Sequence, residues 1–358
     1  MRIIELIPTI ASGGGEKFVV DLSNELSIQG HDVSLITLFD YNDSFIFESL
    51  VNKNVKRISL HKKEGLDISC FFKVLNVIRK IKPDVVHAHV GAIKYITLSA
   101  ILYKKCRYFA TIHSEAKREA GNSIDLYSRK FLFTNKMVTA VTISDESLRS
   151  FEEFYGISAP MIMNGCSAYS EYSKVSDYHK DVDLLFVHAG RIQKVKNQYR
   201  LVKSFQRLIE EGYNVRLLLL GRIEHEDVFE SIRPYFSDKI VYLGEKNNCR
   251  DYMNVADAFC LSSNMEGMPI TVIEAMSVGC IPIVTPVGGC VNMIYNRENG
   301  FIAKDCTDEA YYDSLKEFAS IGSEERTLIS DKTKETFVKT YSISSSAINY
   351  VKLFNEKK

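Results

Sequence analysis

Two glutamates, Glu266 and Glu274, bracket a turn and the expected start of a helix. The apolar run before them, residues 258–262, is typical of a buried strand; Gly267 ends that strand and Pro269 begins a helix. Glu266 then lies in the turn, and Glu274 lies on the helix roughly a turn and a half after Pro269. Both carboxylates can therefore face one crevice at the carboxyl end of the strand, where α/β sheets bind ligands.

The expected helix start offers a second kind of contact. The amides of Ile270 and Thr271 are donors at the positive end of the helix dipole, where phosphate oxygens bind readily. With phosphates on these amides, ribose hydroxyls on Glu274 and a sugar near Glu266, the segment would hold a nucleoside diphosphate sugar. The alternative is structural: Glu266 caps a loop, and Glu274 is a solvated helix residue.

Other motifs decide between these interpretations. Residues 266–274 resemble the E-x7-E motif of the retaining glycosyltransferases of family 4, which have the GT-B fold. Further segments resemble motifs of that family, in its order, over roughly residues 1 to 301: Gly13-Gly-Gly-Glu16, Asp84-Val-Val-His-Ala-His89, Thr111-Ile-His113, Met163-Asn-Gly165, Gly190-Arg-Ile-Gln-Lys-Val-Lys196, Thr285-Pro-Val-Gly-Gly289 and Asn299-Gly-Phe301. Their succession identifies the chain as a member of that family.

The resemblance implies roles for individual residues. Arg191 and Lys196 would hold the diphosphate, and His113 would lie against the donor sugar. With Glu266, these are the expected catalytic residues. The expected donor-binding residues are Gly14, Gly15, Gly190, Gly267, Met268, Pro269, Ile270, Thr271 and Glu274. Glu16 and His89 are expected on the acceptor side.

The expected chemistry follows from the charges. When the C1–O bond of the donor breaks, negative charge grows on the leaving phosphate, and fixed cations stabilise it by about 3 kcal/mol each. The family implies retention at C1, for which we favour same-face attack, with Glu266 positioning the sugar, over a carboxylate nucleophile. Asp181-Val-Asp183 is the one Asp-x-Asp sequence and precedes a strand, so no metal is expected. No cofactor is expected beyond the donor, a UDP-sugar by family frequency.

The glycine-rich loop could also belong to another nucleotide site. A dinucleotide fingerprint starting at Gly13 would need glycine where Phe18 stands, and the chain has no Gly-Lys-Ser/Thr of a P-loop. Asp40, at the end of the second expected strand, is the residue that favours NAD. Three consecutive glycines instead let the backbone approach a ligand closely, and the following helix offers amides to a diphosphate.

Three histidines are candidates for chemistry. His87 and His89 alternate with apolar residues on one expected strand and so share a face. As zinc ligands they lack a third partner in sequence, which favours structural hydrogen bonding or an acceptor contact. His113 closes another apolar strand, where the resemblance implies contact with the sugar and the alternative is a purely structural role.

Composition limits the class of protein. The 358 residues suffice for about two domains, and 45 basic residues balance 45 acidic ones, so the charge does not indicate nucleic acid. The eight cysteines form no Cys-x-x-Cys, which indicates reduced cysteines in a cytoplasmic protein.

Glu5 and Pro8 interrupt the first apolar run, which favours a strand over a signal peptide. No apolar stretch approaches the roughly 18 residues of a membrane span, so we expect a protein that is soluble or peripheral to a membrane.

Short β-branched runs alternate with amphipathic stretches, which predicts βαβ units and parallel sheets. The predicted fold is α/β: two Rossmann-like, doubly wound domains facing each other across a cleft. The first domain is expected at 1–167 with a final helix at about 343–358, a linker at 168–182, and the second domain at 183–342. Expected strands lie near 2–7, 33–39, 55–60, 84–89, 107–113, 138–143 and 160–163, then 183–189, 214–220, 239–243, 258–262 and 281–285. Expected helices lie near 15–29, 69–81, 93–103, 124–136, 145–154, 197–211, 226–236, 249–256, 269–278 and 343–356.

The acceptor side shows one pattern. Basic residues are interleaved with aromatic ones in the first domain: Lys104, Lys105, Arg107, Arg118, Arg129, Lys130 and Lys136, with Tyr103, Tyr108, Phe131 and Phe133. They could form a face that rests on anionic lipid at the inner face of the plasma membrane while the enzyme acts on a polyprenyl-linked saccharide. The alternative is a set of solvated helix faces.

Three functions remain open from sequence. The first is a hexosyltransferase-type enzyme of surface polysaccharide assembly, making capsule, exopolysaccharide or O-antigen from a nucleotide sugar and a saccharide acceptor. The second is a sugar-nucleotide epimerase on the same fold, which needs no acceptor. The third is a non-catalytic binding module, disfavoured because Arg191, Lys196, Glu266 and Glu274 are all present.

Overall fold

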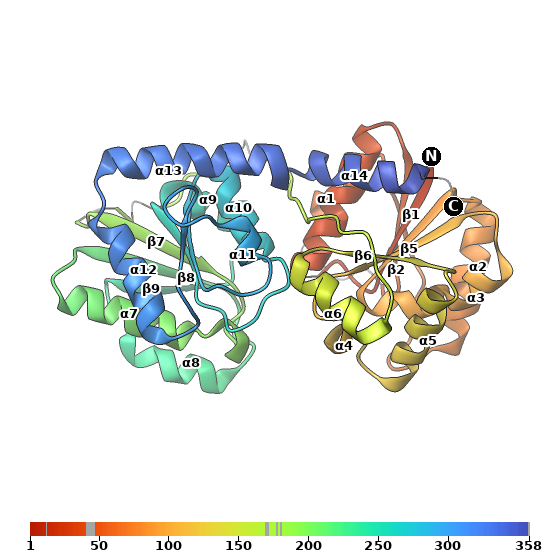
Figure 1. The fold of residues 1–358 in the computed structure, drawn as a ribbon, viewed down its shortest axis with the longest axis horizontal. Coiled ribbons are helices and arrows are strands. Elements are labelled where there is room, and N and C mark those ends of the chain that lie inside the picture. The colour runs from red at the N-terminus through yellow and green to blue at the C-terminus, as the bar shows by residue number, and fades with distance from the viewer. Residues whose placement is uncertain (12, 41–46, 169–171, 177, 180, 357–358) are drawn as a thin grey trace. The chain divides into compact units, whose positions relative to one another are not determined.

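The computed structural model describes residues 1–11, 13–40, 47–168, 172–176, 178–179 and 181–356. The chain forms two compact units, Met1–Ser167 with Ile343–Lys358 and Ala168–Ser342. The helix α14 (Ile343–Asn355) therefore belongs to the first unit although it follows the second in sequence (Figure 1). None of the helices within these ranges has both the length and the hydropathy of a membrane span.

The first unit is a six-stranded parallel sheet in the order β3-β2-β1-β4-β5-β6. Its strands are β1 (Arg2–Ile7), β2 (Asp32–Thr37), β3 (Lys56–Ser59), β4 (Val85–His89), β5 (Arg107–Ile112) and β6 (Thr139–Thr142). The helices besides α14 are α1 (Gly14–Ile28), α2 (Ile68–Ile81), α3 (Thr97–Leu102), α4 (Ala116–Glu119), α5 (Ser123–Thr134) and α6 (Asp145–Tyr155). Strand order reverses between β1 and β4, the position at which doubly wound sheets bind ligands.

The second unit repeats this topology. Its order is β12-β11-β10-β7-β8-β9, which is the order of the first sheet when the strands are counted along the chain. The strands are β7 (Leu184–Ala189), β8 (Val215–Leu220), β9 (Ile240–Gly244), β10 (Ala258–Leu261), β11 (Ile281–Val284) and β12 (Phe301–Ile302). The helices are α7 (Gln198–Glu210), α8 (Glu226–Ile232), α9 (Cys249–Val255), α10 (Ile270–Val278), α11 (Cys290–Met293), α12 (Asp308–Ser320) and α13 (Ser323–Thr336). Here the order reverses between β7 and β10.

Three expected elements differ in the structure. The strand predicted at 160–163 is wrong: Met161 makes a single bridge to Thr142, and Pro160 has no amide to donate to a ladder. The helix predicted at 226–236 ends at Ile232 and continues as a 3-10 turn, because Pro234 cannot donate to the carbonyl one turn back. The helix predicted at 93–103 is a 3-10 turn over Val90–Ile96 followed by α3.

The sheet of the first unit is buried on both faces. Ile4 and Leu6 of β1 pack into the apolar core on one face together with Val86 and Ala88 of β4. Side chains alternate along a strand, so the intervening Glu5 faces the other side, which α1 and α14 cover. A carboxylate is thereby placed in the interior of the unit.

The basic, aromatic face predicted from sequence is wrong in part. Arg129 is fully buried; its guanidinium contacts Glu119 and Asp125 at 3.0 Å each and donates to the carbonyl of Val90. A buried cation needs such partners, which explains two carboxylates around one arginine. Tyr108 and Phe133 are buried as well. Lys104, Lys105, Arg118, Lys130 and Lys136 remain exposed.

Candidate functional site

An ion pair joins the two segments that follow the central strands of the second unit. Lys196 lies in a 3-10 turn, Lys194–Lys196, that follows β7, and Glu266 lies in the turn after β10. Lys196 Nζ lies 2.7 Å from Glu266 Oε1, and the Ser263 hydroxyl donates to the same oxygen at 2.5 Å. Because β7 and β10 are neighbours at the switch point, two residues 70 apart in sequence meet at one edge of the sheet.

A neutral histidine supports the turn that carries Arg191. His188 donates from Nδ1 to the carbonyl of Cys260 at 2.9 Å, so its Nε2 accepts from the Gln198 amide at 3.2 Å. The same amide donates to the carbonyl of Arg191 at 2.8 Å. Burial, with a smaller contribution from Lys196, lowers the pKa of His188 to about 4. The Arg191 side chain is exposed.

The turn after β10 is packed against a second glycine turn. Gly288 has φ +55°, and a Cβ there would lie 2.3 Å from the carbonyl oxygen of Glu266. The Gly289 amide donates to the carbonyl of Gly267 at 2.6 Å, and the Thr285 hydroxyl donates to that of Ser263, also at 2.6 Å. The Thr285–Gly289 motif therefore holds the backbone that carries Glu266.

Glu274 is paired with a cation that the sequence did not indicate. It lies on α10 with its side chain 14% exposed, and Arg250 of α9 contacts its Oε1 at 3.3 Å through both Nε and Nη2. The helix begins after Pro269 without a side-chain cap, so the first amides of α10, those of Ile270 and Thr271, have no acceptor within the helix. Met268 is buried beside them.

These groups lie at the carboxyl end of one sheet and suit an anion with attached hydroxyls. Helix amides and the Lys196 ammonium attract phosphate, whereas the two carboxylates accept from hydroxyls. Gly190 and Gly267 lie in the turns that present Lys196 and Glu266. The second unit thus joins Lys196 to Glu266 and pairs Glu274 with Arg250, and the structure adds Ser263 and Arg250 to the residues predicted from its segments.

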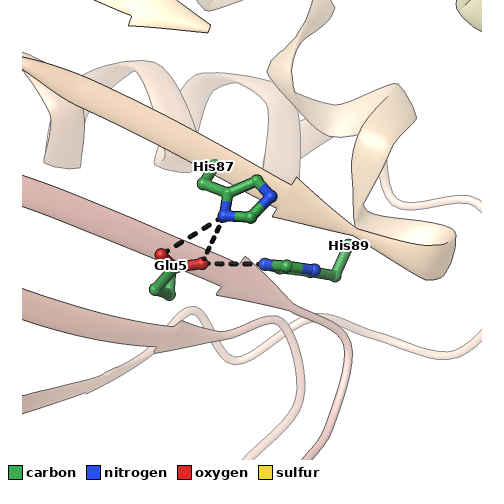
Figure 2. A group of neighbouring side chains, drawn as sticks. All are labelled: Glu5, His87 and His89. Carbon is green, nitrogen blue, oxygen red and sulfur yellow. Dashed lines mark hydrogen bonds and ion pairs between the residues drawn. The ribbon is translucent and has the colours of Figure 1, made fainter. Parts of the chain in front are cut away.

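A second polar group lies inside the first unit, at the equivalent switch point. Figure 2 shows Glu5 of β1 pointing towards His87 and His89 of β4. Glu5 Oε2 lies 3.0 Å from His87 Nδ1 and 2.7 Å from His89 Nε2, and all three side chains are fully buried. The register pairs Glu5 with His87, which supplies the third partner that the sequence did not reveal. By residue type and spacing the three could also hold a metal ion.

The candidate residues of the glycine loop lie near this group. Gly14 and Gly15 form the first turn of α1, and a Cβ on Gly15 would lie 3.6 Å from His113 Nδ1. Glu16 folds back over Gly13. His89 is fully buried with one nitrogen on Glu5 and the other 3.0 Å from His113 Nε2. The structure therefore places His89 behind His113, and this corrects its predicted position on an acceptor surface.

Comparison with known proteins covers both units. Residues 12–166 match the model of Glycosyltransferase Family 4, and residues 173–336 match that of Glycosyl transferases group 1. A capsular polysaccharide biosynthesis glycosyltransferase of Staphylococcus aureus is 28% identical over 241 residues, which are 63% of this chain and 66% of that protein. An undecaprenol-linked-saccharide α-1,4-N-acetyl-D-galactosaminyltransferase of Campylobacter jejuni is 23% identical over 321 residues, 86% of each chain.

Solved structures show the same fold. The Anabaena protein HepE in complex with UDP and glucose aligns with a TM-score of 0.79 at 15% identity, covering 99% of both chains. A mutant of the Staphylococcus aureus protein TarM, crystallised in complex with UDP, aligns with a TM-score of 0.79 at 10% identity, covering 99% of this chain and 100% of that one. At these identities the likeness establishes the two-domain α/β GT-B fold.

We expect Gly288→Ala to damage the site far more than Gly212→Ala. Both glycines have positive φ, but a Cβ at Gly212 meets nothing within 4 Å. Gly212→Ala should cost about 1 kcal/mol of unfolding free energy, from backbone strain alone, and Gly288→Ala roughly 3 kcal/mol, because the turn under Glu266 must move. Urea unfolding measures both, and equal losses would contradict the packing described.

We also expect acid to destabilise the second unit through His188. Its folded pKa of about 4 lies below the ordinary value of 6.5, so the unfolded chain binds the proton more readily, and stability is lost as pH falls through this window. For each extra proton that the unfolded chain binds, the free energy of unfolding falls by about 1.4 kcal/mol for every unit by which the pH is lowered. Between pH 6.5 and 4.5 the wild type should lose about 2–3 kcal/mol more than His188→Gln in urea unfolding. Parallel pH profiles for the two proteins would rule this out.

Proposed function

The chain belongs to the group 1 glycosyltransferases of family 4, and from that premise we propose that it moves a hexose or N-acetylhexosamine from a UDP-sugar to a lipid-linked saccharide. The product would enter a bacterial surface polysaccharide. The named relatives support this, since one acts in capsule biosynthesis and another on an undecaprenol-linked saccharide. The UDP complex of a structural neighbour supports the choice of nucleotide.

The observation that carries the proposal is the Lys196–Glu266 pair at the amino end of α10. Lys196 is held at 2.7 Å from Glu266 with its side chain 17% exposed, so a diphosphate bound at the helix amides meets a cation that is already positioned. A fixed charge of this kind needs no reorganisation when the leaving group gains negative charge. Arg191, exposed on the turn before it, would supply a second cation.

The reaction that we propose retains the configuration at C1 and uses no metal. The acceptor oxygen bonds to C1 on the face from which the phosphate leaves, the C1–O bond to phosphate breaks, and the acceptor proton passes to the leaving phosphate oxygen. Lys196 and Arg191 neutralise the growing charge, and Glu266 accepts from sugar hydroxyls and so orients the ring. Glu274 would accept from the ribose, and His113 from a substrate hydroxyl.

A donor panel tests this function. The protein is incubated with UDP-, GDP- and ADP-sugars, with and without a polyprenyl-diphosphate saccharide, in buffer containing EDTA. We expect acceptor-dependent release of UDP and a glycosylated lipid of retained anomeric configuration by NMR. Isomerised donor without acceptor would indicate the epimerase, which the named relatives do not support, and complete loss in EDTA would refute the metal-free reaction.

Lys196→Ala should lower kcat by about two to three orders of magnitude while changing donor affinity less, because the charge that it meets grows in the transition state. Lys194→Ala is the matched control. Lys194 lies in the same 3-10 turn, but it is 68% exposed and pairs with Asp227. A fall of less than tenfold for Lys196→Ala, in protein that is folded by circular dichroism, would remove Lys196 from the leaving-group role.

The corrected acceptor-side surface still suits a membrane contact. Large apolar side chains are exposed on α3 and α5, which pack together: Ile101, Leu102, Ile124, Tyr127 and Phe131. Exposed lysines flank them at positions 104, 105 and 130. Apolar side chains rimmed by lysine are the pattern of a surface that inserts shallowly into anionic lipid. We therefore propose that this surface rests on the membrane that carries the acceptor.

Vesicle flotation tests the membrane contact. The protein should float with phosphatidylglycerol vesicles at low salt and detach at high salt, because screening weakens the attraction of the lysines. The double variant Tyr127→Glu, Phe131→Glu should lose most of the floating fraction. Leu328→Glu, at an equally exposed apolar position on α13, should keep it. Absence of wild-type flotation would refute the contact.

A further inference from the structure

The Glu5–His87–His89 group is sealed from solvent by aromatic side chains. Tyr350 and Phe354 of α14 lie against it, with their rings 4.9 Å and 5.7 Å from the His87 ring, and Phe18 of α1 packs on Tyr350. A buried carboxylate is costly unless its oxygens accept hydrogen bonds. The oxygens of Glu5 must therefore accept hydrogen bonds from the two histidines, and this requirement determines which atoms of the group donate and which accept.

Burial raises the pKa of Glu5, and its hydrogen bond and charge interaction with His89 oppose that shift. The ionised carboxylate can only accept, which assigns both histidines beside it. His87 must carry its hydrogen on Nδ1 and His89 on Nε2. In the neutral rings the opposite nitrogens then accept. Burial lowers the pKa of His87 well below its ordinary value and that of His89 to about 3, which keeps both rings neutral.

These assignments also fix the hydrogen bonds to the residues on either side. His87 Nε2 accepts from the Thr111 hydroxyl at 2.7 Å, and that oxygen accepts from the Tyr350 hydroxyl at 2.8 Å. His89 Nδ1, 3.0 Å from His113 Nε2, accepts the hydrogen that His113 must carry on that nitrogen. Every member of the chain from Tyr350 to His113 is thereby satisfied with one consistent set of hydrogens.

One atom is left over at the end of the chain. His113 Nδ1 is buried and has no hydrogen-bond partner among the described residues, and it lies against Gly15 in the first turn of α1. With Nε2 protonated, this nitrogen carries a lone pair. An unsatisfied acceptor beside a glycine-rich loop is a position that a ligand hydroxyl can complete.

We propose that Glu5 and His89 are positioning residues that act through His113, fixing its Nε2–H tautomer so that Nδ1 accepts a hydrogen bond from a substrate hydroxyl. That the hydroxyl belongs to a sugar nucleotide or its acceptor rests on the proposed function. The tautomer of His113 does not depend on that function. Neither Glu5 nor His89 touches substrate in this account. Both act as the partners that orient a histidine, as second partners do in other histidine sites.

The charge of Glu5 is the element on which the tautomer depends. If Glu5 gains a proton, it donates to His89 Nε2, His89 Nδ1 donates to His113 Nε2, and His113 must carry its hydrogen on Nδ1. The ionisable groups around His113 in the described structure are His89 at 3.0 Å, Glu119, which accepts from the backbone amide of His113 at 2.6 Å, Arg129 and His87. Burial lowers the pKa of His113, with Glu119 opposing and Arg129 adding to the shift, so the ring stays neutral.

A metal ion is the competing occupant of this group. Glu5, His87 and His89 have the right donor atoms, but the three already satisfy one another, with the Glu5 carboxylate accepting from both rings. A metal would take the lone pairs of His87 Nδ1 and His89 Nε2. Those two nitrogens would then lose their hydrogens, His89 would carry its hydrogen on Nδ1, and His113 Nε2 would become an acceptor. The metal-bound group and the metal-free group therefore require opposite tautomers of His113.

Histidine-selective nitrogen-15 NMR at pH 7.5 decides between them. Two-bond nitrogen–proton spectra distinguish Nδ1–H from Nε2–H rings, and His113→Gln identifies the His113 signals by their loss. We expect the Nε2–H tautomer of His113 in the wild type. An Nδ1–H ring, or one equivalent of zinc in the purified protein by plasma mass spectrometry, overturns the proposal, and neither readout requires a donor or an acceptor.

Glu5→Gln tests the positioning role. Its amide can donate to His89 Nε2, so an Nδ1–H population of His113 should appear, and kcat/KM for transfer should fall by about tenfold or more. The matched control is His87→Gln, which also alters a contact of Glu5 but does not touch His113; the His113 ring should stay Nε2–H. Unchanged His113 signals in Glu5→Gln would contradict the proposal. If the wild type keeps the Nε2–H ring but transfers no sugar, the proposed function fails and the positioning role stands.

Discussion

The ion pair between Lys196 and Glu266 is the contact on which the proposed donor site depends. Each side chain is largely buried, and either charge alone would be costly at that exposure. At 2.7 Å each group is the partner of the other before a ligand arrives. Neighbouring residues hold both members of the pair in place. Ser263 donates to the Glu266 carboxylate, the Gly288–Gly289 turn holds the backbone of Glu266, and His188 supports the turn before Lys196.

The same topological constraint places the polar groups of both units. In each sheet the strand order reverses beside the first strand, so the segments after the first and fourth strands diverge and leave room for side chains between them. In the second unit this position holds Lys196 and Glu266, and in the first it holds Glu5 and the histidines of β4. A repeated fold thus carries two different polar groups, an ion pair at the rim of one sheet and a buried carboxylate in contact with two histidines inside the other unit.

Much of this arrangement could be predicted from sequence because its signals are local. Alternating β-branched and amphipathic runs predicted the sheets, and Gly267 with Pro269 predicted the turn before α10. Contacts set by sheet register or by helix packing could not be predicted: Glu5 meets His87 across 82 residues, and Arg250 meets Glu274 from another helix. Arg129 was misread for the same reason, since a basic residue looks solvated until the carboxylates around it are known.

In the proposed site Glu274 holds the nucleotide while Glu266 orients the sugar, and calorimetry with UDP separates these two roles. Glu274→Gln loses charge-assisted hydrogen bonds to ribose, so the affinity for UDP should fall by roughly 1.5–3 kcal/mol. Glu266→Gln should leave the affinity for UDP nearly unchanged, because that side chain faces the sugar and the amide oxygen of a glutamine can still accept from Lys196 and keep it in position. Equal losses of UDP affinity in the two variants would contradict this division of roles between Glu274 and Glu266.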